Sequence, residues 1–175
     1  LDVKPGNRFM HRGRSASQNP IQEIFKNSNS RITAHKDKNP KWTMESLKKN
    51  TAHVSELFLG HVRYGTFGQN SVEAVHPFLR QNNWMHRNLI VAGNFNMTNN
   101  KELFNDLVML GQHPKEMSDT VTVMERIGHF LDDAVGKIYQ KLKKSGVSKI
   151  EASSIIGEQL NLIKILKKAS KDWDG

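Results

Sequence analysis

Polar side chains with complementary chemistry occur in three separated stretches of the sequence. The first supplies the guanidinium of Arg63, the second the carboxamide of Asn94 beside backbone N–H groups, and the third the carboxylate of Asp119. A free α-amino acid is bound by such groups, because a guanidinium holds its carboxylate with two parallel hydrogen bonds and a carboxylate holds its ammonium. The combination is compatible with a binding site for an amino acid.

Catalysis at such a site also requires donors for an oxyanion. Asn94 and a neighbouring backbone N–H are suited to this role. Each residue also has an ordinary structural interpretation: Arg63 as a salt bridge at a strand end, Asn94 as a turn former, and Asp119 as a favourable charge at a helix N-terminus. Residue types and spacing leave both interpretations open.

The first two stretches each follow an apolar run that is typical of a strand. Residues 56–64 are mostly apolar and aromatic and end at Gly65, and residues 88–93 form a second run of this kind. Ligands are often gathered at the ends of buried strands. A further short strand is expected at residues 7–14, and residues 65–83, which are rich in Gly, Asn and Gln, are expected to form a loop.

Short helices are expected in the first half of the chain. Residues 20–25 carry Pro in the first helical turn, and residues 44–50 predict another helix. The polar residues 27–42 between them predict a loop.

Longer helices are predicted in the second half of the chain. Asn99 is a candidate N-cap for a helix that ends at Gly111, Ser118 begins a long helix, and Ser148 with Glu151 forms a capping box for a last helix. The long helix has apolar residues at helical spacing that predict its buried face: Val123, Met124, Ile127, Phe130, Leu131, Ala134, Val135, Ile138 and Leu142.

The chain has 175 residues, a formal net charge of +9 and no cysteine. This length suits one domain with a buried core. The absence of cysteine excludes a disulfide framework, a thiolate zinc site and a cysteine nucleophile within these residues. The longest apolar run is too short to cross a membrane, and residues 1–6 are not a signal peptide. We therefore expect a cytoplasmic protein without a membrane partner.

The positive charge admits a polyanionic partner. The Lys and Arg residues are spread along the chain, however, and no helix-turn-helix, zinc-finger or RNP-type motif accompanies them. We expect a solvated basic surface, with a phosphate-bearing substrate or nucleic acid as the less favoured alternative.

Four segments resemble, in the same order and with close to the same spacing, the class II glutamine amidotransferases, whose glutaminase domains are N-terminal-nucleophile hydrolases. The clear match covers about residues 59–130. Tyr64, where glucosamine-phosphate synthases typically have Trp, favours the amidophosphoribosyltransferase branch. The segments are Gly-His-Val-Arg-Tyr-Gly-Thr at residues 60–66, Ala-Val-His-Pro-Phe at residues 74–78, Asn-Phe-Asn-Met-Thr-Asn at residues 94–99 and Ser-Asp-Thr at residues 118–120.

The resemblance implies a role for each matching residue. Arg63 would bind the α-carboxylate of glutamine, and Asp119 would bind its α-amino group. The side chain of Asn94 and the backbone N–H of Phe95 would stabilise the oxyanion. The implied reaction is glutamine hydrolysis through a thioester, with ammonia passed to a second active site and no cofactor in this domain. The other substrate-binding positions are Tyr64, Gly65 and Thr66.

This sequence departs from the pattern of the family at the second stretch and at the nucleophile. Phe95 stands where the family usually has Gly, and Gly93 stands where His is commoner, so we expect Gly93 to relax the turn in compensation. The family's nucleophile is an N-terminal cysteine whose own α-amino group is the base, and Leu1 is not that residue. We expect the cysteine to precede Leu1 in a longer protein, with an inactive relative as the alternative.

The fold implied by the resemblance is α+β, the four-layer αββα sandwich of the family, truncated at both ends. Residues 1–175 would be a fragment of a single glutaminase domain, with residues 146–172 as a helical insertion. The acceptor of ammonia would be phosphoribosyl pyrophosphate in purine synthesis, held by a synthase domain of the same longer chain in a homo-oligomer. Two alternatives are a glucosamine-phosphate synthase type of enzyme, and a non-catalytic module on the same fold that binds an amino acid or a polyanion.

Overall fold

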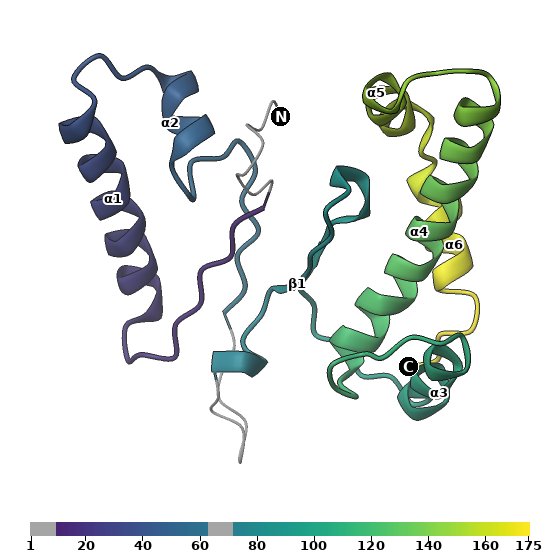
Figure 1. Cartoon of the computed structure of the whole chain (residues 1–175). Coiled ribbons are helices and arrows are strands. Elements are labelled where there is room, and N and C mark those ends of the chain that lie inside the picture. Colours follow the sequence, from purple (N-terminus) through teal and green to yellow (C-terminus); the bar gives the residue numbers. More distant parts are fainter. Residues whose placement is uncertain (1–9, 63–71) are drawn as a thin grey trace. The chain divides into compact units, whose positions relative to one another are not determined.

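The computed structural model describes residues 10–62 and 72–175 (Figure 1). The chain forms two compact units, Leu1–Pro77 and Phe78–Gly175. It combines helices with a small antiparallel sheet, which is an α+β composition.

Helix α1, Pro20–Lys38, is much longer than the helix predicted at residues 20–25. The proline at its start fits the first turn, where no backbone N–H is needed. No further proline and no glycine interrupts the helix, and Asn39 ends it by donating from Nδ2 to the His35 carbonyl at 2.8 Å. The loop predicted at residues 27–42 is therefore wrong over most of its length, because a polar composition does not prevent a helix.

Helix α2, Met44–Asn50, confirms the prediction for these residues. Thr43 Oγ1 accepts from the Ser46 N–H at 3.1 Å, and Ser46 Oγ accepts from the Thr43 N–H at 3.0 Å. This reciprocal capping box satisfies donors that the first turn leaves unpaired. Leu47 is the residue that α2 buries. The next regular element among the described residues is the short 3-10 helix η1, Val72–Ala74.

The strand predicted at residues 56–64 is wrong for residues 56–62, which have no regular structure. The strand predicted at residues 7–14 is likewise absent from its described part, residues 10–14. Leu57 and Phe58 are 88% and 71% exposed. A strand requires partners for its backbone N–H and C=O groups, and within the described residues no strand pairs with these positions.

The second unit contains strands β1, Phe78–Arg80, and β2, Leu89–Val91, which pair antiparallel with Leu79 opposite Ile90. Strand β2 confirms the strand predicted at residues 88–93, although its side chains are half-buried rather than buried. Strand β1 lies in the predicted loop, since an element of three residues is too short to show an alternating pattern.

Helices α3, Asn100–Met109, and α4, Asp119–Lys144, begin where the sequence predicts. Ser118 Oγ accepts from the Val121 N–H at 3.4 Å, as expected of an N-cap. Gly111 follows α3 with a φ of +79°, a left-handed conformation that commonly ends helices at glycine.

Helices α5, Lys149–Gln159, and α6, Leu162–Ala169, replace the single last helix predicted after Ser148. The predicted capping box is present at the start of α5. Asn161 begins α6, because its Oδ1 accepts from the Lys164 N–H at 2.9 Å. The apolar spacing of the sequence does not reveal this break, since it continues across both helices.

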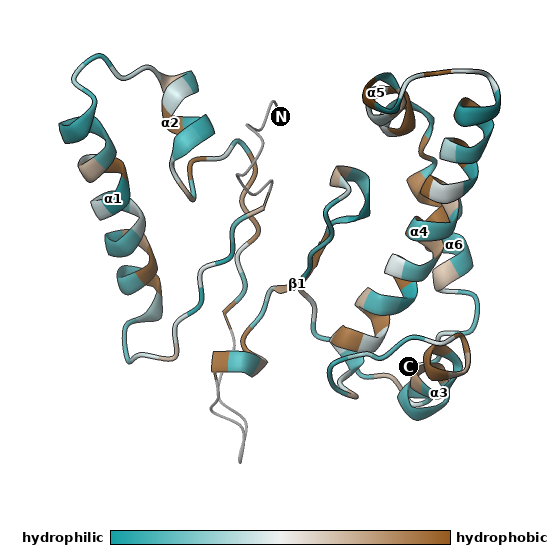
Figure 2. Ribbon diagram, in the orientation of Figure 1, coloured by the Kyte–Doolittle hydropathy of each residue, from teal (hydrophilic) through white to brown (hydrophobic). Residues whose placement is uncertain are grey.

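Helix α4 is the central element of the second unit and packs against both strands, α3, α5 and α6. Leu131 and Val135 pack with Ile156 of α5 and Ile165 of α6. Figure 2 shows hydrophobic and hydrophilic residues alternating along α4, as expected of a helix with one buried face. Every residue of the predicted apolar face of α4 is buried or half-buried. Among the described residues, no helix combines the length and the apolar character needed to cross a membrane.

Candidate functional site

The structure describes some of the predicted site residues and not others. Outside the described residues lie Arg63, Tyr64, Gly65 and Thr66. Within the second unit lie Asn94, Phe95 and Asp119.

Residues 92–99 connect β2 to α3, and we call them the site loop. The backbone N–H of Met97 in this loop donates to Asp119 Oδ2 at 3.0 Å. Asp119 is the first residue of α4, so the loop and the helix start are joined directly. A carboxylate has about four acceptor positions, so this bond leaves capacity for an ammonium group. The structure therefore joins the loop that carries Asn94 to Asp119, through a backbone donor three positions after Asn94.

The side chains of the site loop alternate in exposure. Asn94 and Asn96 are exposed, whereas Phe95 and Met97 are half-buried. A period of two is typical of an extended chain. The carboxamide of Asn94 is therefore accessible to a ligand, while the ring of Phe95 contacts the protein.

The ring of Phe95 lies against the backbone of Gly93. A Cβ placed on Gly93 would lie 2.5 Å from Phe95 Cε2 and 2.6 Å from Phe95 Cζ, well inside an ordinary carbon contact of about 3.5 Å. Neither residue has a positive φ, so the role of Gly93 is to leave room for the ring rather than to relax the turn. The two departures from the family pattern thus form one steric pair, because this position of Phe95 requires glycine at residue 93.

Asp119 also fits a structural role at the start of α4 that requires no ligand. The N-terminus of a helix carries partial positive charge, which favours an acidic residue in the first turn. Ser118 acts as the N-cap and also donates to Glu116 Oε1 at 3.1 Å. A structural role for Asp119 is therefore compatible with a ligand role.

Asn99 occupies the N-cap position of α3 but its side chain does not cap the helix. Its Nδ2 donates instead to the Asp172 carbonyl at 2.7 Å, and the neighbouring Thr98 Oγ1 donates to Asp174 Oδ2 at 2.6 Å. No sequence pattern marks residues 172–174 as neighbours of the site loop, because local patterns report only on residues a few positions apart.

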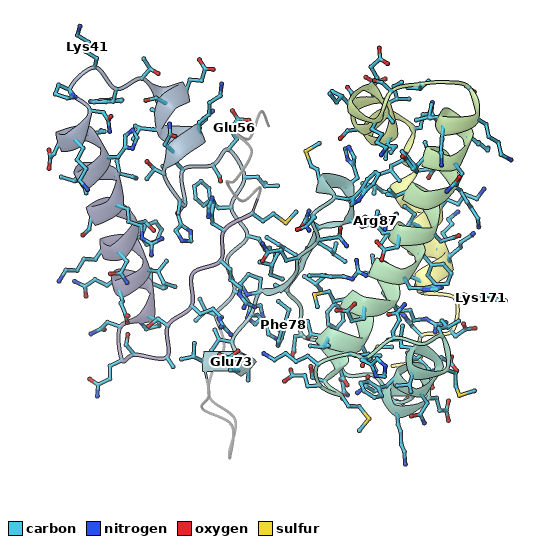
Figure 3. All side chains as sticks on the ribbon, in the orientation of Figure 1. Lys41, Glu56, Glu73, Phe78, Arg87 and Lys171 are labelled. Carbon is cyan, nitrogen blue, oxygen red and sulfur yellow. The ribbon has the colours of Figure 1, made fainter. Side chains whose placement is uncertain are left out.

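A network of ion pairs attaches the sheet to α4. Arg80 of β1 donates from Nε to Glu125 Oε2 at 2.9 Å and from Nη2 to Asp132 Oδ2 at 2.7 Å. Burial by itself lowers the pKa of Arg80, but the hydrogen bonds to the two carboxylates outweigh it and raise the pKa above its ordinary value. Arg87, labelled in Figure 3, ends the 3-10 helix η2, Met85–Arg87, and its Nε lies 3.8 Å from Asp132 Oδ1. The network fixes β1 and therefore its partner β2, which leads into the site loop.

Within the described parts of the chain, no group of three or more His, Cys, Asp or Glu residues is arranged to hold a metal ion. Comparisons of the chain with models of known protein families, with curated proteins and with solved structures gave no match.

Proposed function

We propose that this chain is the glutaminase domain of a glutamine-dependent amidotransferase, built on the four-layer αββα fold of the N-terminal-nucleophile hydrolases. The observation that carries the proposal is the hydrogen bond from the Met97 N–H to Asp119 Oδ2 at 3.0 Å. It joins the loop that would supply the oxyanion donors to the carboxylate that would bind the substrate ammonium. The resemblance of the sequence motifs supplies the identity of the substrate.

In the proposed reaction, the thiolate of a cysteine that precedes Leu1 attacks the side-chain amide carbon of glutamine. The oxyanion that forms accepts hydrogen bonds from the side chain of Asn94 and the backbone N–H of Phe95. The α-amino group of the same cysteine, which took the thiol proton, passes it to the amide nitrogen, the C–N bond breaks and ammonia leaves. Water then attacks the thioester carbon and gives a proton to the departing thiolate, which releases glutamate and the thiol.

The two ends of the substrate are bound by groups of opposite charge. Asp119 binds the α-ammonium group, and Arg63 binds the α-carboxylate with the adjacent residues 64–66. Holding both ends fixes the amide carbon near the nucleophile, which replaces a bimolecular encounter by a positioned attack.

The proposed acceptor of ammonia rests on Tyr64, which favours the amidophosphoribosyltransferase branch of the family. We propose that ammonia passes to phosphoribosyl pyrophosphate in a synthase domain of the same longer protein, a cytoplasmic homo-oligomer of purine synthesis. The glutaminase half uses no cofactor, because amide hydrolysis is nucleophilic and acid–base chemistry.

The test measures glutamate release from glutamine by the full-length protein and its Asp119→Ala variant. Removing one partner of a charge pair at the substrate should lower kcat/KM by roughly 100-fold, equivalent to about 3 kcal/mol. Asp133→Ala is the matched control, because Asp133 lies on the same helix and pairs with the exposed Lys137 at 2.6 Å. Its activity should equal that of the wild type.

Two outcomes would contradict the proposal. One is equal glutamine kinetics in the wild type and Asp119→Ala. The other is a wild-type protein that does not bind glutamine but binds RNA or DNA with strong salt dependence, which would identify a non-catalytic module.

A further inference from the structure

The site loop has neither helix nor strand over residues 92–97, yet its donors must be held in place. An oxyanion hole is effective because its donors are already oriented when negative charge develops. Contacts from outside the loop must therefore fix it. The bond from Met97 to Asp119 is one such contact, and the others come from the C-terminal residues.

Residues 172–174 are hydrogen-bonded to the end of the site loop. The Thr98 N–H donates to the Asp174 carbonyl at 2.9 Å, and Thr98 Oγ1 donates to Asp174 Oδ2 at 2.6 Å. Asn99 Nδ2 donates to the Asp172 carbonyl at 2.7 Å. Figure 1 accordingly shows the C-terminus beside α3. These bonds give the site loop a support that is distant in the sequence.

Arg126 of α4 holds residues 172–174 in turn. Its Nη2 donates to the carboxylate of Asp172, and its Nε donates to the Ala169 carbonyl at 3.0 Å. Asp106 of α3 lies 3.5 Å from its Nη1. Arg126 is only 7% exposed, and a buried guanidinium without partners is costly. The position of residues 172–174 is therefore coupled to the packing of α4.

The site loop is thus attached to α4 at two points. Asp119 holds the loop directly, and Arg126 holds it through residues 172–174. Residues seven positions apart lie on one face of a helix, separated by about two turns or roughly 10 Å. A single rigid helix therefore supports both ends of the segment between Met97 and Asn99.

We propose that Thr98, Arg126 and Asp172 are positioning residues of the glutaminase site, an inference that rests on the proposed function. They touch neither the substrate nor the reacting atoms. They fix the site loop so that the donors of Asn94 and Phe95 meet the oxyanion.

Thr98→Val in the full-length protein tests the first of these residues, because it removes the hydroxyl but keeps the shape and the backbone N–H. Loss of a hydrogen bond to a carboxylate should make the Met97 and Thr98 amides exchange with deuterium roughly tenfold faster. Misplaced donors should lower kcat about 10- to 100-fold, while KM for glutamine changes by less than about threefold. Thr98→Ser keeps the hydroxyl and should restore both values.

Asp172→Asn tests the link to Arg126. It should also make the Met97 and Thr98 amides exchange faster and lower kcat for glutamine. Asp133→Asn is its matched control, because it removes a carboxylate from an ion pair with the exposed Lys137 on the same helix. It should change neither measurement. Amides of α5 report on global opening, and they should exchange at the wild-type rate in every variant.

The outcomes separate this inference from the proposed function. Unchanged exchange in Thr98→Val and Asp172→Asn would overturn the positioning role, and so would faster exchange with an unchanged kcat. A wild-type protein with its nucleophile that hydrolyses no glutamine, but whose variants show the expected faster exchange, would overturn the proposed function and leave the attachment of the loop in place.

Discussion

Gly93→Ala is expected to destabilise the protein through its contact with Phe95. The added Cβ would lie 2.5 Å from Phe95 Cε2, about 1 Å less than an ordinary carbon contact. Overpacking of this kind costs about 1–3 kcal/mol. Because the φ of Gly93 is not positive, alanine would also stabilise by about 0.4–1 kcal/mol by reducing the entropy of the unfolded chain. The net fall in the free energy of unfolding should therefore lie between about 0 and 2.6 kcal/mol, with a midpoint of about 1.3 kcal/mol.

A double-mutant cycle with Phe95→Ala isolates the steric effect. In that background the new Cβ meets no ring, and Gly93→Ala should be neutral or stabilise by up to about 1 kcal/mol. The coupling energy between the two positions should be about 1–3 kcal/mol. Urea-induced unfolding measures all four variants.

The matched control for this cycle is Gly136→Ala on α4. A Cβ at Gly136 meets no atom within 4 Å, so the variant should stabilise by about 0.5–1 kcal/mol through its helix propensity. If Gly93→Ala had the same effect with and without the Phe95 ring, the steric pairing of the two residues would be refuted.

Three further expectations concern the sheet attachment and the substrate contacts. Gly128→Ala should lower the free energy of unfolding by about 1–3 kcal/mol, because its Cβ would overlap Arg80 Nε and Cδ; an equal cost in an Arg80→Ala background would argue against this cause. Asn94→Ala in the full-length protein should lower kcat for glutamine hydrolysis by roughly 100-fold, about 3 kcal/mol, with little change in KM, because its contact strengthens in the transition state. A rise in KM alone would make Asn94 a ground-state ligand. Arg63→Ala should abolish most glutaminase activity while the urea midpoint stays unchanged, and wild-type-like kinetics would contradict its assignment.

Local signals in the sequence predicted the elements whose ends are set by nearby residues. The N-cap at Ser118, the capping box at Ser148 and the apolar face of α4 depend on residues three or four positions apart, and all are present. The prediction for helix α1 stopped too early, because the polar composition of its second half resembles that of a loop. Strand β1 was not predicted because three residues do not establish a period.

Local sequence patterns did not predict contacts between residues that are distant in the chain. Asn99 has the sequence context of an N-cap, but its carboxamide bonds to Asp172, 73 residues away. Arg126 lies three positions after Val123 on the buried face of α4, and this spacing is the one signal that marks it as a buried charge. The contact between Phe95 and Gly93 depends on a side-chain conformation that residue types do not specify.

The sequence supplied the candidate site as a set of residue types, and their arrangement around a ligand stays a prediction. The sequence singled out Asn94 and Asp119, and the structure joins the loop that carries Asn94 to Asp119 through the backbone N–H of Met97. The support from residues 172–174 was not predictable, because it depends on how α4, α5 and α6 pack.

A crystal structure of the full-length protein with bound glutamate, the product of the proposed reaction, tests the central claim most directly. We predict the ammonium nitrogen of glutamate within about 3 Å of an Asp119 carboxylate oxygen, and its α-carboxylate at a similar distance from the Arg63 guanidinium. Glutamate bound elsewhere would contradict the claim. So would a structure in which the Arg63 guanidinium and the Asp119 carboxylate lie on opposite sides of the molecule.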